Sequence, residues 1–172
     1  MSAETITKTN QYLTFGLSSE VFAVEVGKVR EILDYTPITK VPRTPEFMRG
    51  VINVRGSVVP VVDLRLKFGM TQTERTLGTC IIVLEIALEG ETIILGALAD
   101  SVQEVIELEP EQIEPAPKIG VRVHNEFIRG MGKTDSGFIM ILDIDSVFSS
   151  GELDMVVDAG DGIGNMAEAR AV

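Results

Sequence analysis

The sequence predicts a mainly β protein in which two related five-stranded β-barrels pack together as one unit. Hydrophobic residues make up 45% of the 172 residues, and they gather in short segments rich in Val and Ile. Turn-forming residues separate these segments, a pattern typical of short strands joined by hairpins. The second half of the chain repeats the plan of the first half. Each copy supplies about five strands, enough for a small barrel whose closure removes exposed sheet edges.

The first half begins with two predicted strands, residues 11–17 and 21–26, joined by a short polar turn. Residues 29–35 form a third extended segment, which leads into a loop that carries three of the seven prolines. Residues 46–49 are expected to form a single helical turn that ends at Gly50, because glycine commonly terminates helices.

A second predicted hairpin closes the first half. Strands 51–54 and 57–64 flank Arg55 and Gly56, which fit a tight turn. Pro60 lies inside the second strand and has no backbone N–H for a ladder hydrogen bond. We therefore expect this strand to lie at a sheet edge or to carry a β-bulge.

The second half supplies the equivalent strands, residues 80–88, 92–99 and 102–108, followed by a loop that contains prolines. The closing segments of the two halves, residues 46–68 and 126–148, align without a gap at a spacing of 80. Identical Glu, Phe, Arg, Gly and Asp residues occupy matching places. Chance similarity among Val-rich strands does not explain these polar matches, so we interpret the pattern as an internal repeat. Two copies are too few for a solenoid.

Composition excludes several classes of protein. There are 26 acidic and 15 basic residues, a net charge of −11, and this argues against a nucleic-acid partner. Cys80 is the single cysteine, so no intramolecular disulfide is expected. The apolar segments are much shorter than the roughly 20 residues of a membrane-spanning helix, and the first ten residues lack a signal-peptide pattern. We expect a cytoplasmic protein that does not insert into the membrane.

No residue pattern indicates a cofactor, a metal site or an active site. A single histidine, His124, excludes sites that need two imidazoles, and it lies in a polar stretch typical of a solvated loop. Gly132-Lys133-Thr134 resembles the end of a phosphate-binding loop but lacks the loop's first glycine, so we interpret it as a turn.

Two aspartates hold equivalent places in the two copies. A catalytic pair formed by Asp63 and Asp143 is conceivable. Each of them precedes a short apolar segment, however, which favours the capping of a helix N-terminus. A small-ligand-binding barrel or a hydrolase that uses Asp63, Asp143 or His124 stays open as an alternative.

The copies differ at the second hairpin, where only the first copy has Arg55. An arginine at a hairpin tip presents a planar fork of donors to a carboxylate of a partner. Glu31 lies in an apolar stretch and is a candidate to orient this arginine through an ion pair. The alternative is a solvated arginine that contributes almost nothing. The residues alone leave both interpretations open.

Four segments, residues 29–32, 44–69, 98–117 and 126–145, together resemble the CheW family of chemotaxis adaptors. The resemblance runs in order from about residue 11 to residue 149. Its most specific part is the block NxRGxVxPVxDLR, which starts at Asn53.

The resemblance implies two five-stranded SH3-like β-barrel subdomains around a shared apolar core, with short helices. It also implies a non-enzymatic adaptor without a cofactor, which couples the cytoplasmic tips of methyl-accepting chemoreceptors to the histidine kinase CheA. Other CheW copies within the signalling array are further expected partners. A CheW-like adaptor of a chemosensory pathway that does not control motility is the alternative. We expect a flexible arm at 1–10, the CheW-like domain at 11–149, and a helical or disordered tail at 150–172.

Carried over residue by residue, the resemblance places Val29, Glu31, Gly50 and Arg55 in a receptor-binding groove between the subdomains. Val58 is expected at the rim of this groove. A leucine that the family has before the arginine is replaced by valine here, a mild departure. The kinase-binding surface receives no residue assignment.

Overall fold

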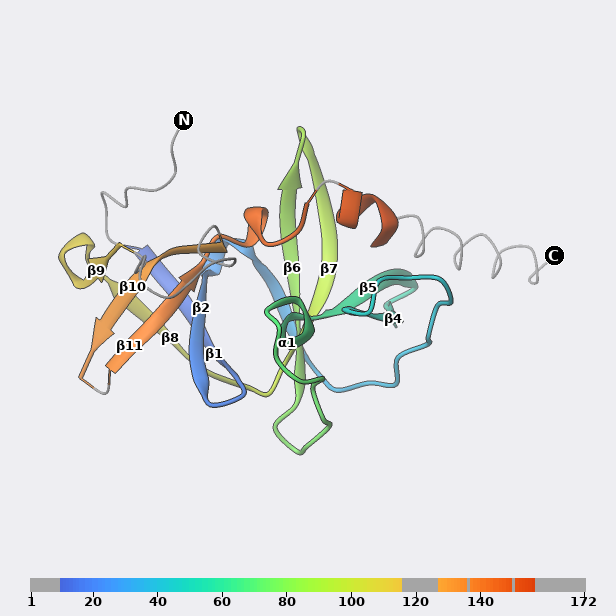
Figure 1. The fold of residues 1–172 in the computed structure, drawn as a ribbon, viewed down its shortest axis with the longest axis horizontal. Helices are drawn as coiled ribbons and strands as arrows, with labels where there is room; N and C mark the ends of the chain where they lie inside the picture. The colour runs from blue at the N-terminus through green and yellow to red at the C-terminus, as the bar shows by residue number, and fades with distance from the viewer. Residues whose placement is uncertain (1–9, 116–126, 136, 150, 157–172) are drawn as a thin grey trace.

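The computed structural model describes residues 10–115, 127–135, 137–149 and 151–156 (Figure 1). Two curled sheets form two barrel-like subdomains, so the mainly β fold class is confirmed. The six-stranded sheet contains β1 (Asn10–Leu17), β2 (Glu20–Glu25), β8 (Ser101–Leu108), β9 (Ile113–Glu114), β10 (Ile128–Thr134) and β11 (Gly137–Leu142). The five-stranded sheet contains β3 (Val29–Asp34), β4 (Met48–Val54), β5 (Ser57–Asp63), β6 (Cys80–Leu88) and β7 (Glu91–Ala99). Short helical segments join them: η1 (Val26–Lys28), α1 (Leu64–Lys67), η2 (Pro110–Gln112) and η4 (Ile144–Ser146).

Each sheet takes strands from both halves of the chain. The six-stranded sheet, in the order β8-β1-β2-β11-β10-β9, joins the first hairpin of the first half to four strands of the second half. The five-stranded sheet, in the order β3-β6-β7-β5-β4, joins the first hairpin of the second half to three strands of the first half. The prediction that each copy forms its own barrel is therefore wrong. The exchange pairs a free edge of each hairpin with a strand from the other half.

Two parallel strand pairs mark the places where the halves meet. Phe22 of β2 pairs with Met140 of β11, and Val61 of β5 pairs with Gly96 of β7. All other strand pairs in both sheets are antiparallel. The matching positions of the two parallel pairs preserve the internal repeat in three dimensions.

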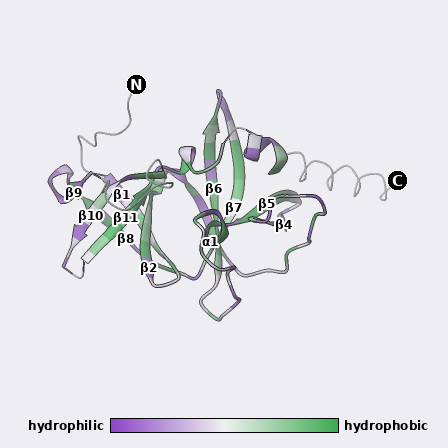
Figure 2. Cartoon of the chain, in the orientation of Figure 1, coloured by the Kyte–Doolittle hydropathy of each residue, from purple (hydrophilic) through white to green (hydrophobic). Residues whose placement is uncertain are grey.

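The main hydrophobic core lies between the two sheets and contains aromatic residues that the repeat relates. Phe47 packs on Phe148 with a distance of 5.4 Å between ring centroids, and Phe68 packs on Phe127 at 5.8 Å. A smaller apolar cluster lies within each sheet. In Figure 2, hydrophobic residues concentrate on the strands, and the hairpin tips are more hydrophilic. This distribution follows from the strand pattern in the sequence.

The C-terminal part of the described chain packs onto this core. Residues 151–156 are helical, and Leu153 and Val156 are buried in the main core, beyond the residue 149 that the sequence suggested as a boundary. Lys67 holds this helix through both carboxylate oxygens of Glu152, each 2.8 Å from its Nζ. The expected arm and tail fall largely outside the described residues, but Asn10 already belongs to β1.

Two local predictions are wrong. Residues 46–49 do not form a helical turn, because β4 starts at Met48 and Gly50 lies inside that strand. The main-chain atoms of Thr39 bond to the neighbouring Val51 and draw residues 48–50 into the sheet instead. Gly132, Lys133 and Thr134 are the last residues of β10 rather than a turn.

Pro60 does not lie on an edge strand, because β5 runs between β7 and β4. The paired residue, Val51, uses both its N–H and its C=O to bond Thr39 at 2.8 and 2.9 Å. Val51 and Pro60 are thus a non-hydrogen-bonded pair, and the nitrogen of Pro60 faces β7. Parallel pairing with β7 begins one residue later, at Val61, so the missing N–H breaks no ladder bond. The bulge lies in β4, between Met48 and Gly50.

Candidate functional site

The tip of the β4–β5 hairpin presents Arg55 in a fixed backbone conformation. Arg55 and Gly56 adopt positive φ angles of 49° and 90°, as a tight turn between twisted strands requires. The side chain of Asn53 accepts a hydrogen bond from the N–H of Gly56 at 2.8 Å and closes the turn. The predicted hairpin is confirmed.

Arg55 and Glu31 form a two-point ion pair. Nη1 of Arg55 donates to Oε1 of Glu31 at 3.1 Å, and Nη2 donates to Oε2. The Arg55 side chain is 72% exposed, whereas that of Glu31 is 24% exposed. The hydrogen bonds from the guanidinium lower the pKa of the Glu31 carboxyl below its ordinary value. The pairing suggested by the sequence therefore exists, and it leaves the remaining N–H groups of Arg55 toward solvent.

The ion pair spans the opening of the five-stranded barrel. Glu31 lies on β3 and Arg55 follows β4, and these strands occur at opposite ends of the sheet order. In the loop after β3, Thr39 forms two backbone hydrogen bonds with Val51 of β4. The barrel thus closes by a backbone bridge at one level and by a side-chain pair at its mouth.

A concave surface of ≈ 410 Å³ lies beside this ion pair. Its rim includes Val58, which is 37% exposed, and its floor is formed by Val59, Val83 and Ile94. All residues that line it belong to the five-stranded sheet or its hairpin, so this surface lies on one subdomain. The receptor-binding groove between the subdomains that the resemblance implies stays a prediction. The arrangement offers a depression with an apolar floor, and the charged side chains of Arg30, Glu31 and Arg55 line it as well.

The five residues that the resemblance indicated do not all meet at this surface. Glu31, Arg55 and Val58 line it, but Val29 and Gly50 do not. Val29 packs against the main core. Gly50 is buried with a φ of 144°, and a Cβ atom there would lie 2.1 Å from the carbonyl oxygen of Thr39. Gly50 is thus the residue that lets the loop after β3 cross β4.

Sequence reasoning missed the floor of the concave surface. Val83 lies on β6 and Ile94 on β7, which come from the second half of the chain. No local signal connects these residues to Arg55, because only the exchange of hairpins brings them together. Val59 was not assigned to the site either, because strand alternation places it on the face opposite its neighbour Val58.

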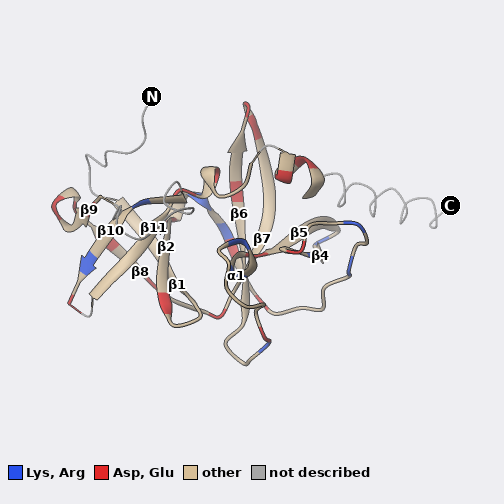
Figure 3. Cartoon of the chain, viewed as in Figure 1, with Lys and Arg blue, Asp and Glu red and all other residues tan. Residues whose placement is uncertain are grey.

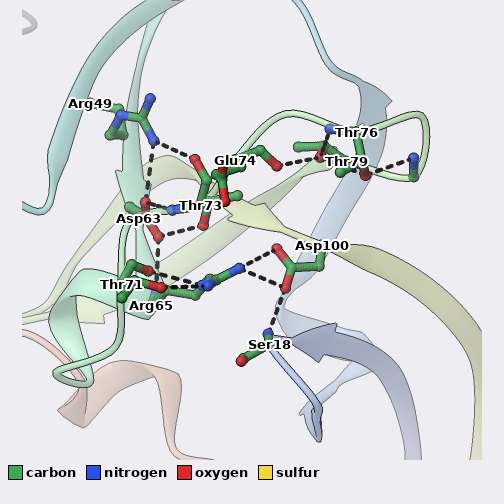
Figure 4. Close-up of polar contacts among 11 residues, drawn as sticks. Ser18, Arg49, Asp63, Arg65, Thr71, Thr73, Glu74, Thr76, Thr79 and Asp100 are labelled. Carbon is green, nitrogen blue, oxygen red and sulfur yellow. Dashed lines mark hydrogen bonds and ion pairs between the residues drawn. The ribbon is translucent and has the colours of Figure 1, made fainter.

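Asp63 is the centre of a second polar cluster, shown in Figure 4. It is fully buried, and it accepts hydrogen bonds from the backbone N–H groups of Arg65 and Thr73 at 3.0 and 2.9 Å. The Thr73 hydroxyl donates to it at 2.7 Å and Arg49 Nη1 at 3.2 Å. The capping prediction is confirmed for Asp63, which also fixes the loop after α1 to the barrel. Burial and four internal donors keep this carboxylate from any substrate.

Asp143 does not share these contacts. Its side chain accepts a hydrogen bond from the Ser146 hydroxyl at 3.0 Å and caps no backbone N–H of η4. The capping prediction is therefore wrong for Asp143, because a single 3₁₀ turn replaces the α-helical turn of the first copy.

Among the residues that the structure describes, the other candidates for chemistry form no catalytic or metal site. Cys80 is buried, and desolvation raises the pKa of its thiol, which disfavours the reactive thiolate. His124 lies outside the described residues. Within the described ranges, His, Cys, Asp and Glu side chains form no group of three or more that could hold a metal ion. The helices that the structure describes are all too short or too polar to cross a membrane.

Comparison with known proteins identifies the family. A CheW-like domain model matches residues 11–152. The chain is 35% identical over 146 residues to the chemotaxis protein CheW of Klebsiella aerogenes, a match that covers 85% of this chain and 86% of that protein. It is 33% identical over 142 residues to the chemotaxis protein CheW of Rhizobium meliloti, covering 83% and 89% of the two chains.

A solved structure has the same fold. The crystal structure of the scaffolding protein TtCheW from Thermoanaerobacter tengcongensis superposes with a TM-score of 0.72 and 33% sequence identity. The match covers 83% of this chain and 94% of that chain, so it includes both sheets. The chain therefore belongs to the CheW-like family, whose members are non-catalytic chemotaxis scaffold proteins.

Proposed function

We propose that this protein couples the cytoplasmic tips of methyl-accepting chemoreceptors to the histidine kinase CheA at the inner face of the membrane. The observation that carries the proposal is the Glu31–Arg55 fork at the edge of an apolar depression. This depression suits a receptor face that carries apolar side chains and carboxylates together. The apolar side chains pack on Val58 and the floor of the depression, and the carboxylates accept hydrogen bonds from the exposed N–H groups of Arg55.

The five proposed receptor-site residues have two kinds of role in this account. Glu31, Arg55 and Val58 lie where they can contact the receptor directly. Gly50 and Val29 act indirectly, because Gly50 sets the path of the loop beside β4 and Val29 anchors the start of β3 in the core. Substitutions at these two positions displace the strands that carry the direct contacts.

An adaptor of this type acts by holding two partners together. Simultaneous binding raises the effective concentration of the kinase near the receptor, and the geometry of the contacts lets receptor state bias the kinase. The kinase must then use a surface other than the depression beside Arg55. An adaptor for a pathway that does not control motility would use the same contacts with different receptors.

The test is co-sedimentation of the protein with a receptor cytoplasmic fragment and with CheA. Wild type is expected to bind both partners. Arg55→Asp is expected to lose binding to the receptor fragment and to keep binding to CheA. Lys133→Asp is the matched control, because Lys133 is an exposed cation on a strand of the other sheet. Circular dichroism must show all variants folded. Failure of the wild type to bind either partner would refute the proposed coupling.

A further inference from the structure

The lysines and arginines of the described chain divide into two groups. Eight of them form ion pairs with carboxylates. The other three described cations, Lys40, Arg43 and Arg75, form no ion pair within the described ranges. In a protein with a net charge of −11, cations without a carboxylate partner in the described part of the chain are notable.

These three cations line two surfaces that share one tyrosine. Lys40 and Arg43 line a concave surface of ≈ 740 Å³, and Arg75 lines a second of ≈ 470 Å³. Tyr35 belongs to both surfaces, so they adjoin at its side chain. The guanidinium carbon of Arg75 lies 4.4 Å from the centroid of the Tyr35 ring, a cation–π contact that holds Arg75 in place. Figure 3 shows the basic positions along the long loop between β3 and β4.

The lining of these surfaces is mixed. Arg49 also lines the larger surface, but it forms an ion pair with Asp63. Each surface also has one carboxylate, Glu46 on the larger surface and Asp34 on the smaller one. Apolar groups lie among the charges, and Leu77, at the tip of the loop after α1, is fully exposed. The combination favours a ligand that has carboxylates and apolar side chains together.

The net charge of the protein bears on how an acidic ligand can bind. A net charge of −11 disfavours the close approach of an acidic partner, because repulsion between charges is screened only beyond the Debye length, about 8 Å at physiological salt. An acidic partner that binds nevertheless must meet a local positive surface. The same overall charge would draw a basic partner to the many exposed carboxylates elsewhere on the chain.

We propose that the two surfaces that meet at Tyr35 bind an extended acidic segment of a partner protein. Carboxylates of the segment pair with Lys40, Arg43 and Arg75, and its apolar side chains pack near Tyr35 and Leu77. No residue of these surfaces lines the depression beside Arg55. The contact is thus additional to the proposed receptor site, and it does not depend on the identity of the receptor or the kinase.

The probe is a short fluorescein-labelled peptide of repeated Glu-Glu-Leu, with the Gln-Gln-Leu peptide as its uncharged match. Fluorescence anisotropy at physiological salt is expected to show binding of the acidic peptide to the wild type and not of the uncharged one. Arg43→Glu and Lys40→Glu are each expected to weaken this binding by about five-fold or more, as for a charge at an interface rim. Lys133→Glu changes the net charge equally on the other sheet and is expected to leave binding unchanged.

Three outcomes would overturn the proposal. The first is no binding of the acidic peptide by the folded wild type. The second is an equal loss of binding in Arg43→Glu and Lys133→Glu, which would show that net charge alone matters. The third is self-association of the wild type, measured by sedimentation equilibrium and abolished by Arg43→Glu, which would make a second copy of this chain the occupant. Circular dichroism checks that each variant is folded.

Discussion

Arg55 and Glu31 join the two strands that end the five-stranded sheet. Arg55 follows β4, Glu31 lies on β3, and their two-point ion pair crosses the mouth of the barrel. Because Glu31 occupies only one edge of the guanidinium, it orients the fork and leaves other N–H groups free for a partner. One ion pair therefore closes the barrel mouth and presents a donor group.

Arg55→Lys is expected to weaken receptor binding although it keeps the positive charge. Lysine cannot hold Glu31 at two points and offer further planar donors to a partner. Titration with a receptor fragment is expected to show a three- to ten-fold loss of affinity, about 1 kcal/mol of binding free energy. Arg30→Lys is the control, because Arg30 lines the same depression but approaches Glu85 only at 3.7 Å. Wild-type affinity in Arg55→Lys would show that charge alone suffices.

Asp63→Asn is expected to destabilise the fold by about 2–4 kcal/mol, because the amide cannot accept all four hydrogen bonds and Arg49 loses its buried counter-ion. Asp143→Asn is expected to cost less than about 1 kcal/mol, since among the described residues the Asp143 side chain accepts a bond only from Ser146. Urea unfolding measures both values. Equal destabilisation by the two variants would contradict the conclusion that Asp63 caps a helix and Asp143 does not.

Glu152→Gln is expected to lower stability in a pH-dependent way. Desolvation, the largest single effect, raises the pKa of Glu152, but hydrogen bonds from Lys67 and Ser149 together bring it below the ordinary value of 4.5. A lowered folded pKa means that the ion pair stabilises the fold fully above pH 4.5 and that this contribution disappears as the pH falls through the folded pKa.

The measurement is the free energy of unfolding of wild type and Glu152→Gln at neutral pH and well below pH 4.5. We expect a difference of about 1 kcal/mol at neutral pH that vanishes in acid. Glu91→Gln serves as a control at an exposed strand end. A difference that persists in acid would mean that Glu152 acts through packing rather than charge.

Gly50→Ala is expected to destabilise the fold by about 3 kcal/mol or more, because the φ angle of 144° and the approach of Thr39 both exclude a Cβ atom. Gly56→Ala is the matched control. Its φ is 90°, but no atom lies within 4 Å of the new Cβ, so about 1 kcal/mol is expected. Thermal unfolding compares the two variants. A stable Gly50→Ala protein that loses only receptor binding would make Gly50 a direct contact.

Sequence reasoning succeeded where the signal is local. The hairpin that carries Arg55 was predictable because β-forming segments flank a pair of turn residues. The capping role of Asp63 was predictable because it directly precedes a short apolar helix. It failed at Gly50, where the deciding contact comes from Thr39, and at Asp143, where the equivalent helix has a different type of turn.

The sequence by itself determined the strands, their hairpins and the twofold repeat, because these depend on side-chain alternation and turn residues within a few positions. Only the tertiary structure decided that the halves exchange hairpins, so that each sheet draws on both. The same holds for the ion pair that closes the barrel and for the two surfaces that meet at Tyr35 and carry Lys40, Arg43 and Arg75. These features depend on contacts between residues far apart in the chain, and such contacts form only when apolar faces and free strand edges of one half are buried against the other.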